Sequence, residues 1–194
     1  MKAYERNPET MLAPPELRAV HALGKSPVIT DGEITVAETG AIVEYLVDRY
    51  GQGRLRPACG TPEFLRYRYW LHFAEGTAQP QLLLKFHLNR ILGAAATAAE
   101  QAMARDVLST LIAATDTNLR NNLDFMEAEL ARSAWFAGDE FSAADVIMSF
   151  PVEVSAERAG LDASRPLWNY LERIHARPAY RRARERGGPY RFAP

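Results

Sequence analysis

The stretch that decides the fold is Gly24–Gly51, which reads GKSPVITDGEITVAETGAIVEYLVDRYG. Its first half contains two short runs rich in β-branched residues, 27–30 and 34–36, with Asp31-Gly32 between them. An Asp-Gly dipeptide favours a tight turn in which both central residues take a positive φ. The pattern therefore predicts an antiparallel hairpin over residues 27–36, with that dipeptide at its turn.

The second half of the stretch predicts an amphipathic helix that opens at Glu38-Thr39 and ends at Gly51. Apolar residues recur at helical spacing, and glycine commonly follows the last turn. The N-terminus of a helix presents unpaired N–H groups and partial positive charge, which suit a ligand carboxylate. The Thr39 hydroxyl can donate to that carboxylate, and the Glu38 carboxylate can accept from an ammonium group. The alternative is that both residues merely cap the helix.

The dipeptide Ser26-Pro27 opens the first predicted strand. A peptide bond before proline is the one kind for which the cis form is accessible. A cis bond here leaves the backbone of Ser26 free to pair with an extended peptide ligand, as a further strand would. The alternative is an ordinary trans proline at a strand start.

A second motif lies in the other half of the chain, where Phe141-Ser142-Ala143-Ala144-Asp145-Val146 follows Trp135-Phe136-Ala137-Gly138-Asp139. Ser142 and Asp145 have the spacing of a capping box, in which each side chain accepts from the backbone of the other. Phe141 and Val146 flank the box as a hydrophobic staple. The predicted role of this motif is to start a helix, and it is structural.

Together these motifs resemble the cytosolic, bacterial-type glutathione S-transferase family, and the resemblance extends over nearly the whole chain. That family has a thioredoxin-like domain of the α/β class followed by an all-helical C-terminal domain. The resemblance implies a partial thioredoxin-like, glutathione-binding domain at 1–51, a linker at 52–61 and an all-helical domain at 62–194. The capping box corresponds to the structural box in the helical domain of the family.

The resemblance also implies a site for glutathione as co-substrate. In the family, the residue before a cis-proline bonds the cysteinyl backbone of glutathione, and Ser26 before Pro27 matches it. An acid-or-amide and hydroxyl pair binds the γ-glutamyl end, and Glu38 and Thr39 match that pair. Lys25 lies where a polar residue often helps to hold the tripeptide.

The sequence departs from the family pattern at its start. Residues 14–21 predict the helix before the hairpin and 1–6 match the second strand of the domain, so the first strand and first helix have no matching residues. In the family that segment carries the Ser, Tyr or Cys whose hydrogen bond stabilises the glutathione thiolate. The catalytic residue is therefore unknown, and Cys59 lies in the predicted linker. We expect the chain as written to conjugate glutathione poorly.

The second half of the chain predicts a series of helices. Their predicted starts are Thr61-Pro62, Thr97, Ser142, Pro166 and Pro178, and the second of these helices is expected to run to about Leu130. In the family, the first helix of this series lines the acceptor site and the dimer interface. Candidate residues for either role are Tyr67, Trp70, His72 and Phe73. The alternative for each of them is a place in the core.

Composition and net charge exclude several classes of protein. The chain has 194 residues and a net charge of −1, which gives no electrostatic reason to expect nucleic-acid or membrane binding. One cysteine excludes an intrachain disulfide and is consistent with a cytoplasmic protein. Four scattered histidines give no metal-ligand spacing, so no metal is expected.

Two functions stay open at this point. The first is a glutathione S-transferase, in which the thiolate of bound glutathione attacks a small hydrophobic electrophile. The second is a non-catalytic glutathione-transferase-like protein that serves for binding or dimerisation. The resemblance implies a homodimer in both cases, and the sequence does not name the electrophile.

Overall fold

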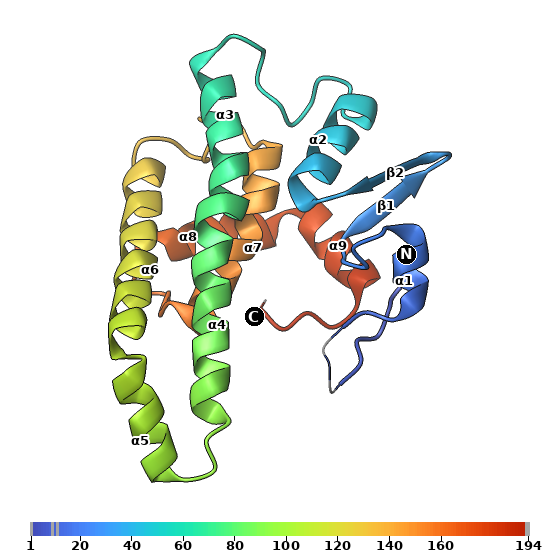
Figure 1. The fold of residues 1–194 in the computed structure, drawn as a ribbon. Helices are drawn as coiled ribbons and strands as arrows, with labels where there is room; N and C mark the ends of the chain where they lie inside the picture. Colours follow the sequence, from blue (N-terminus) through green and yellow to red (C-terminus); the bar gives the residue numbers. More distant parts are fainter. Residues whose placement is uncertain (1, 9, 11, 193–194) are drawn as a thin grey trace. The chain divides into compact units, whose positions relative to one another are not determined.

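The computed structural model describes residues 2–8, 10 and 12–192. The chain divides into two compact units, Met1–Leu55 and Arg56–Pro194 (Figure 1). The division falls within the stretch 52–61 that the sequence predicts to be a linker.

The first unit combines a hairpin with two helices (Figure 1). Its elements are α1 (Pro15–Val20), β1 (Val28–Asp31), β2 (Ile34–Ala37) and α2 (Thr39–Tyr50). α2 packs against both strands and buries Ile42 and Val47. These are the hairpin and the helix that the sequence predicts, and α1 lies within the predicted helix at 14–21.

The turn of the hairpin differs from the prediction. Asp31 pairs with Ile34 at the end of the ladder, so the two central residues are Gly32 and Glu33 rather than Asp31 and Gly32. Only Gly32 among these has a positive φ, at 60°. The carboxylate of Asp31 accepts hydrogen bonds from the hydroxyls of Tyr45, at 2.6 Å, and Tyr50 on α2. The side chain therefore joins the hairpin to the helix.

The strand predicted at 1–6 is also wrong for the residues that the structure describes. Residues 2–7 have no strand assignment, and the sheet of the described chain consists of β1 and β2. A strand is defined by its ladder to a neighbour, and residues 2–7 form no such ladder with the hairpin. Strand propensity alone does not supply a partner.

The second unit is helical in the part of the chain that the structure describes. Its helices are α3 (Pro62–Phe73), the π-helical turn η1 (Ala74–Ala78), α4 (Gln79–Gly93), α5 (Ala98–Val107), α6 (Ser109–Leu130), α7 (Ala143–Arg158), α8 (Pro166–Ala176) and α9 (Pro178–Gly187). The predicted helix starts are confirmed, with Thr61 and Thr97 accepting hydrogen bonds as N-caps. The single helix predicted from Thr97 to Leu130 is instead two, because Leu108 leaves the α region between α5 and α6.

The centre of the second unit is α7, which packs against α3, α4 and α8 (Figure 1). Most of its residues are buried, including Met148, Val152 and Val154. α4 and α6 run side by side and pack on one another, and the short α5 follows α4. Pro151 lies inside α7, where proline withdraws one backbone donor, and the Ser155 hydroxyl donates to the Pro151 carbonyl at 2.7 Å.

The predicted capping box is present at the start of α7. The Ser142 N–H donates to the Asp145 carboxylate at 2.9 Å, and the Ala144 N–H donates to the Ser142 hydroxyl at 3.3 Å. The second oxygen of Asp145 accepts from the Phe136 N–H at 3.0 Å. Asp145 therefore holds the Trp135-to-Asp139 turn as well as its own helix, although it is completely buried.

Candidate functional site

The register of the hairpin brings two of the predicted binding elements to the same end of the first unit. Val28 at the start of β1 is paired with Ala37 at the end of β2. Pro27 and Glu38 come directly before and after this pair, so both leave the hairpin at its open end. The bond between Ser26 and Pro27 is cis, as the family resemblance predicts. Two segments more than ten residues apart in the chain are thus neighbours in space.

Glu38 has an unusual backbone conformation, with φ 72° and ψ 126°. A positive φ is uncommon for a residue with a Cβ, and such residues cluster at functional sites. Glu38 occupies the N-cap position of α2, but its side chain makes no capping hydrogen bond. Its carboxylate is exposed. Helix capping therefore does not account for glutamate at this position.

The first turn of α2 supplies backbone donors next to Glu38. The first backbone hydrogen bond of the helix runs from the Ile42 N–H to the Glu38 carbonyl, at 2.9 Å. The N–H groups of Thr39, Gly40 and Ala41 precede that bond, so they lie at the positive end of the helix dipole. Such an end attracts a carboxylate. The Thr39 hydroxyl lies at the same helix end, on the first helical residue.

A cavity of about 570 Å³ in the first unit is lined by Lys25 and Ser26. The other lining residues are Lys2, Ala3, Tyr4, Arg6, Leu12, Ala13, Leu17, Arg18, Leu23 and Gly24. The lining residues include four cations, Lys2, Arg6, Arg18 and Lys25, and no acidic residue. The cavity therefore suits an anion. Pro27, Glu38 and Thr39 are not among the lining residues; they lie at the open end of the hairpin that follows Ser26.

Sequence reasoning missed the contribution of the segment before α1 to this cavity. Lys2, Tyr4 and Arg6 have no helical or strand periodicity that assigns them to a site, and only the folded chain brings them to Ser26. Gly24 is a local signal for the position of this loop, because it is a buried glycine with a positive φ of 57°. A Cβ at this position lies 2.6 Å from the Arg18 side chain, so glycine permits the tight approach of the Lys25-Ser26 loop to α1.

The four acceptor-site or interface candidates fall into two groups. Tyr67, Trp70 and Phe73 are buried in the core of the second unit, and the Trp70 ring lies 4.3 Å from that of Phe136 between centroids. His72 is exposed on the opposite side of α3. The assignment of these residues to an acceptor site stays a prediction, and of the four only His72 is open to solvent in the described chain.

Three further observations concern groups outside these elements. Cys59 is exposed and forms no disulfide. The described residues contain no group of three or more His, Cys, Asp or Glu side chains arranged to hold a metal ion. Within the same residues, no helix has the length and apolar character required to cross a membrane.

Comparison with known proteins supports the interpretation of both units. Residues 3–48 match the family model for the glutathione S-transferase N-terminal domain, and residues 94–189 match that for the C-terminal domain. Glutathione S-transferase 3 of Schizosaccharomyces pombe is 31% identical over 179 residues, which are 90% of this chain and 72% of the relative.

Solved structures show the same relationship. A glutathione S-transferase from Actinobacillus pleuropneumoniae superposes with a TM-score of 0.73 and 30% identity, covering 95% of this chain and 79% of the other. A sphingomonad glutathione S-transferase, solved in complex with glutathione, gives a TM-score of 0.70 at 25% identity, covering 97% and 87% of the two chains. The chain belongs to the glutathione S-transferase family, and its predicted fold class is confirmed.

Proposed function

We propose that this protein binds glutathione in its first unit and transfers the glutathione thiolate to a small hydrophobic electrophile. Membership of the transferase family supports the reaction class. The observation that carries the assignment of the site is the hairpin register, which places Ser26-Pro27 and Glu38-Thr39 at one end of the sheet. Glutathione is a short peptide with a carboxylate at each end and one ammonium group, so it matches the groups found there.

Each group has a role in this proposal. The backbone of Ser26 pairs with the cysteinyl backbone of glutathione, as in strand addition. Glu38 accepts from the ammonium group, and the Thr39 hydroxyl and the α2 N-terminus bind the neighbouring carboxylate. Lys25 attracts the negative charge of the peptide. The side chain of Glu38 makes no capping hydrogen bond to the helix, and this supports its role because the carboxylate stays available to the ammonium group.

The chemical step is a substitution at an electrophilic carbon. The glutathione thiol loses its proton, the thiolate sulfur forms a bond to that carbon, and the leaving group departs with the electron pair of the broken bond. A hydroxyl that donates to the sulfur lowers the pKa of the thiol. The hydroxyls among the residues that line the cavity of the first unit are those of Tyr4 and Ser26, which are therefore the donors to test.

Substitution of Glu38 tests the binding site. We expect Glu38→Gln to weaken glutathione binding about tenfold, because glutamine still accepts a hydrogen bond from the ammonium group but lacks the negative charge that strengthens it. Isothermal titration calorimetry with glutathione measures the change. Glu44→Gln is the matched control, since Glu44 is exposed on the same helix. We expect this variant to bind glutathione with unchanged affinity. Equal affinities for all three proteins would remove Glu38 from the site.

Conjugation of glutathione to a chlorinated nitrobenzene separates the two open functions. Turnover that falls in Tyr4→Phe or Ser26→Ala, with glutathione binding retained, supports the transferase and identifies the donor. Saturable glutathione binding without turnover supports the second candidate, a non-catalytic binding or dimerisation protein. Absence of glutathione binding contradicts the transferase and leaves only a dimerisation role for the second candidate.

We also propose a homodimer. Large apolar side chains on α3 and α4 are exposed in the single chain, among them Leu65 at 71% and Leu83 at 50%. A second copy that covers these helices removes this apolar surface from water. Light scattering at micromolar concentration should give twice the 21.7 kDa mass of the chain. The mass of a single chain would contradict the proposal.

A further inference from the structure

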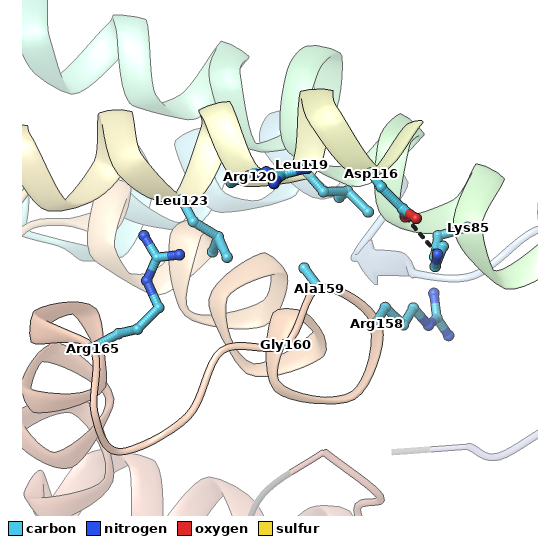
Figure 2. A pocket seen from close by; sticks show the side chains of 9 residues that line it. All are labelled: Lys85, Asp116, Leu119, Arg120, Leu123, Arg158, Ala159, Gly160 and Arg165. Carbon is cyan, nitrogen blue, oxygen red and sulfur yellow. Dashed lines mark hydrogen bonds and ion pairs between the residues drawn. The ribbon is translucent and has the colours of Figure 1, made fainter. Parts of the chain in front are cut away.

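The second unit contains a cavity that the proposed transferase site does not use. It has a volume of about 410 Å³ and lies between α4, α6 and the segment that follows α7 (Figure 2). Its lining residues are Lys85, Asp116, Leu119, Arg120, Leu123, Arg158, Ala159, Gly160 and Arg165. Four cations and one carboxylate therefore line a hollow in a chain whose net charge is −1.

Two of the four cations already have carboxylate partners. Lys85 Nζ lies 2.5 Å from the Asp116 carboxylate, and Figure 2 shows this pair at the right-hand side of the cavity. The Arg165 guanidinium contacts two carboxylates that do not line the cavity, Glu127 at 2.8 Å and Asp124 at 2.5 Å. The charges of Lys85 and Arg165 are therefore balanced within the protein.

Arg158 has no carboxylate partner among the described residues. Its guanidinium carbon lies 4.7 Å from the ring centre of Phe86 and 5.4 Å from that of Phe192, so the group lies close to two aromatic rings. One of its terminal nitrogens donates to the Leu82 carbonyl at 3.3 Å, while its Nε–H is buried without a partner. The adjacent Glu157 carboxylate instead pairs with Arg191. Burial lowers the pKa of Arg158 more than the negative charge of the neighbouring Glu157 raises it, which means that the guanidinium is incompletely solvated.

Arg120 is the second unbalanced cation. It lies on α6, one residue after Leu119, and is exposed. No ion pair or hydrogen bond involves its side chain in the described part of the protein. Figure 2 shows Leu119, Leu123 and Ala159 between Arg158 and Arg165, so an apolar surface separates the cationic ends of the cavity.

From this arrangement we propose that the cavity binds a small organic dianion, either a phosphate monoester or a dicarboxylate. Two guanidinium groups without an ion pair suit a ligand that carries two negative charges, and guanidinium is the side chain best suited to bind either oxyanion. The apolar lining residues Leu119, Leu123 and Ala159 provide a surface for the carbon skeleton of such a ligand. A volume of about 410 Å³ is in the range of small-molecule sites.

The test is calorimetric titration of the full chain with glycerol 3-phosphate and with succinate, at constant low ionic strength. Saturating glutathione is present in one series, because it occupies the proposed transferase site and leaves this cavity open. We expect saturable binding in both series. Titration with acetate at the same ionic strength measures the affinity of a single carboxylate. We expect acetate to bind at least about tenfold more weakly, because one charge-assisted hydrogen bond is lost.

Three variants connect binding to the cavity. Arg120→Gln should weaken binding about tenfold, through the loss of one charge-assisted hydrogen bond. Arg158→Lys keeps the charge and the aromatic neighbours but removes the two-pronged donor, and a similar loss is expected. Arg182→Gln is the control: Arg182 is exposed on α9, so the substitution changes the net charge equally at a distant residue. Melting temperatures establish that each variant is folded.

Each outcome decides the proposal. Binding of glycerol 3-phosphate alone identifies a phosphate monoester, binding of succinate alone identifies a dicarboxylate, and binding of both supports a general dianion site. The proposal is overturned if neither probe binds saturably, if acetate binds equally well, or if Arg182→Gln weakens binding as much as Arg120→Gln. Displacement by glutathione would assign the anion to the first unit instead.

Discussion

Replacement of Asp145 by alanine should lower the free energy of unfolding by roughly 3 kcal/mol or more. The side chain has no exposed surface, and its carboxylate accepts from the Phe136 N–H, the Ser142 N–H and the Ser142 hydroxyl. Alanine leaves these three donors buried without an acceptor, and an unsatisfied buried donor costs about 1–3 kcal/mol. Urea denaturation followed by circular dichroism measures the loss.

Two further variants make this experiment specific. Ser142→Ala removes only the hydroxyl half of the capping box and should cost about 0.5–2 kcal/mol. Asp139→Ala removes an exposed carboxylate from the neighbouring turn, and its effect should stay within about 0.5 kcal/mol. Equal stabilities for Asp139→Ala and Asp145→Ala would show that the buried carboxylate does not organise the turn and helix as described.

Replacement of Glu153 by alanine should also cost roughly 3 kcal/mol or more. Glu153 is buried in α7, with 3% of its surface exposed. One carboxylate oxygen contacts His175 Nε2 at 2.9 Å and accepts from the Tyr180 hydroxyl at 2.6 Å, and the other accepts from the Tyr190 hydroxyl at 2.6 Å. The side chain thus connects α7 to α8, to α9 and to the segment that follows α9.

Alkaline pH should weaken the same cluster. Burial, followed by the hydrogen bond to Glu153, raises the pKa of both Tyr180 and Tyr190 above the usual value. The folded state therefore holds these protons more tightly than the unfolded state. Stability is complete below about pH 10, the pKa of an unfolded tyrosine, and decreases as the pH rises above it. Denaturation of Tyr180→Phe and Tyr190→Phe across this range should show a smaller decrease.

The control for Glu153 lies one turn further along α7. Glu157 binds Arg191 through two contacts of 2.8 and 2.9 Å, but the pair is largely exposed. Exposed ion pairs contribute about 0–1 kcal/mol, so Glu157→Ala should have a small effect. Both glutamates hold the same C-terminal segment, and they differ mainly in burial. A loss for Glu157→Ala as large as that for Glu153→Ala would contradict the interpretation.

Local sequence signals predicted the elements whose causes are themselves local. The β-branched runs around Asp31-Gly32 gave the hairpin, and the cap residues Thr61, Thr97 and Ser142 marked helix starts that the structure confirms. The details of the turn were not predictable in this way. Asp31 belongs to the strand through its backbone pairing with Ile34, and its carboxylate accepts from Tyr45 and Tyr50 on α2, a contact that requires the folded unit.

The candidate site likewise has features that the sequence predicted and features that only the folded structure shows. Its residue types and the cis bond before Pro27 followed from the motif and the family resemblance. The absence of a capping hydrogen bond from Glu38, and its positive φ, were not visible in the spacing, which allowed a cap equally well. The residues Lys2, Tyr4 and Arg6 reach the cavity next to Ser26 without any pattern that predicts them.

The sequence by itself determined the family, the hairpin, the helix starts and the capping box, because turn, cap and periodicity signals act between residues close in the chain. Tertiary structure alone decided which charges lack partners. Lys85 and Arg158 are both cations in helical segments, yet Asp116 on another helix neutralises one, while two aromatic rings lie close to the other. The reason is that the cost of a buried charge depends on neighbours from distant segments, and these are fixed only by packing.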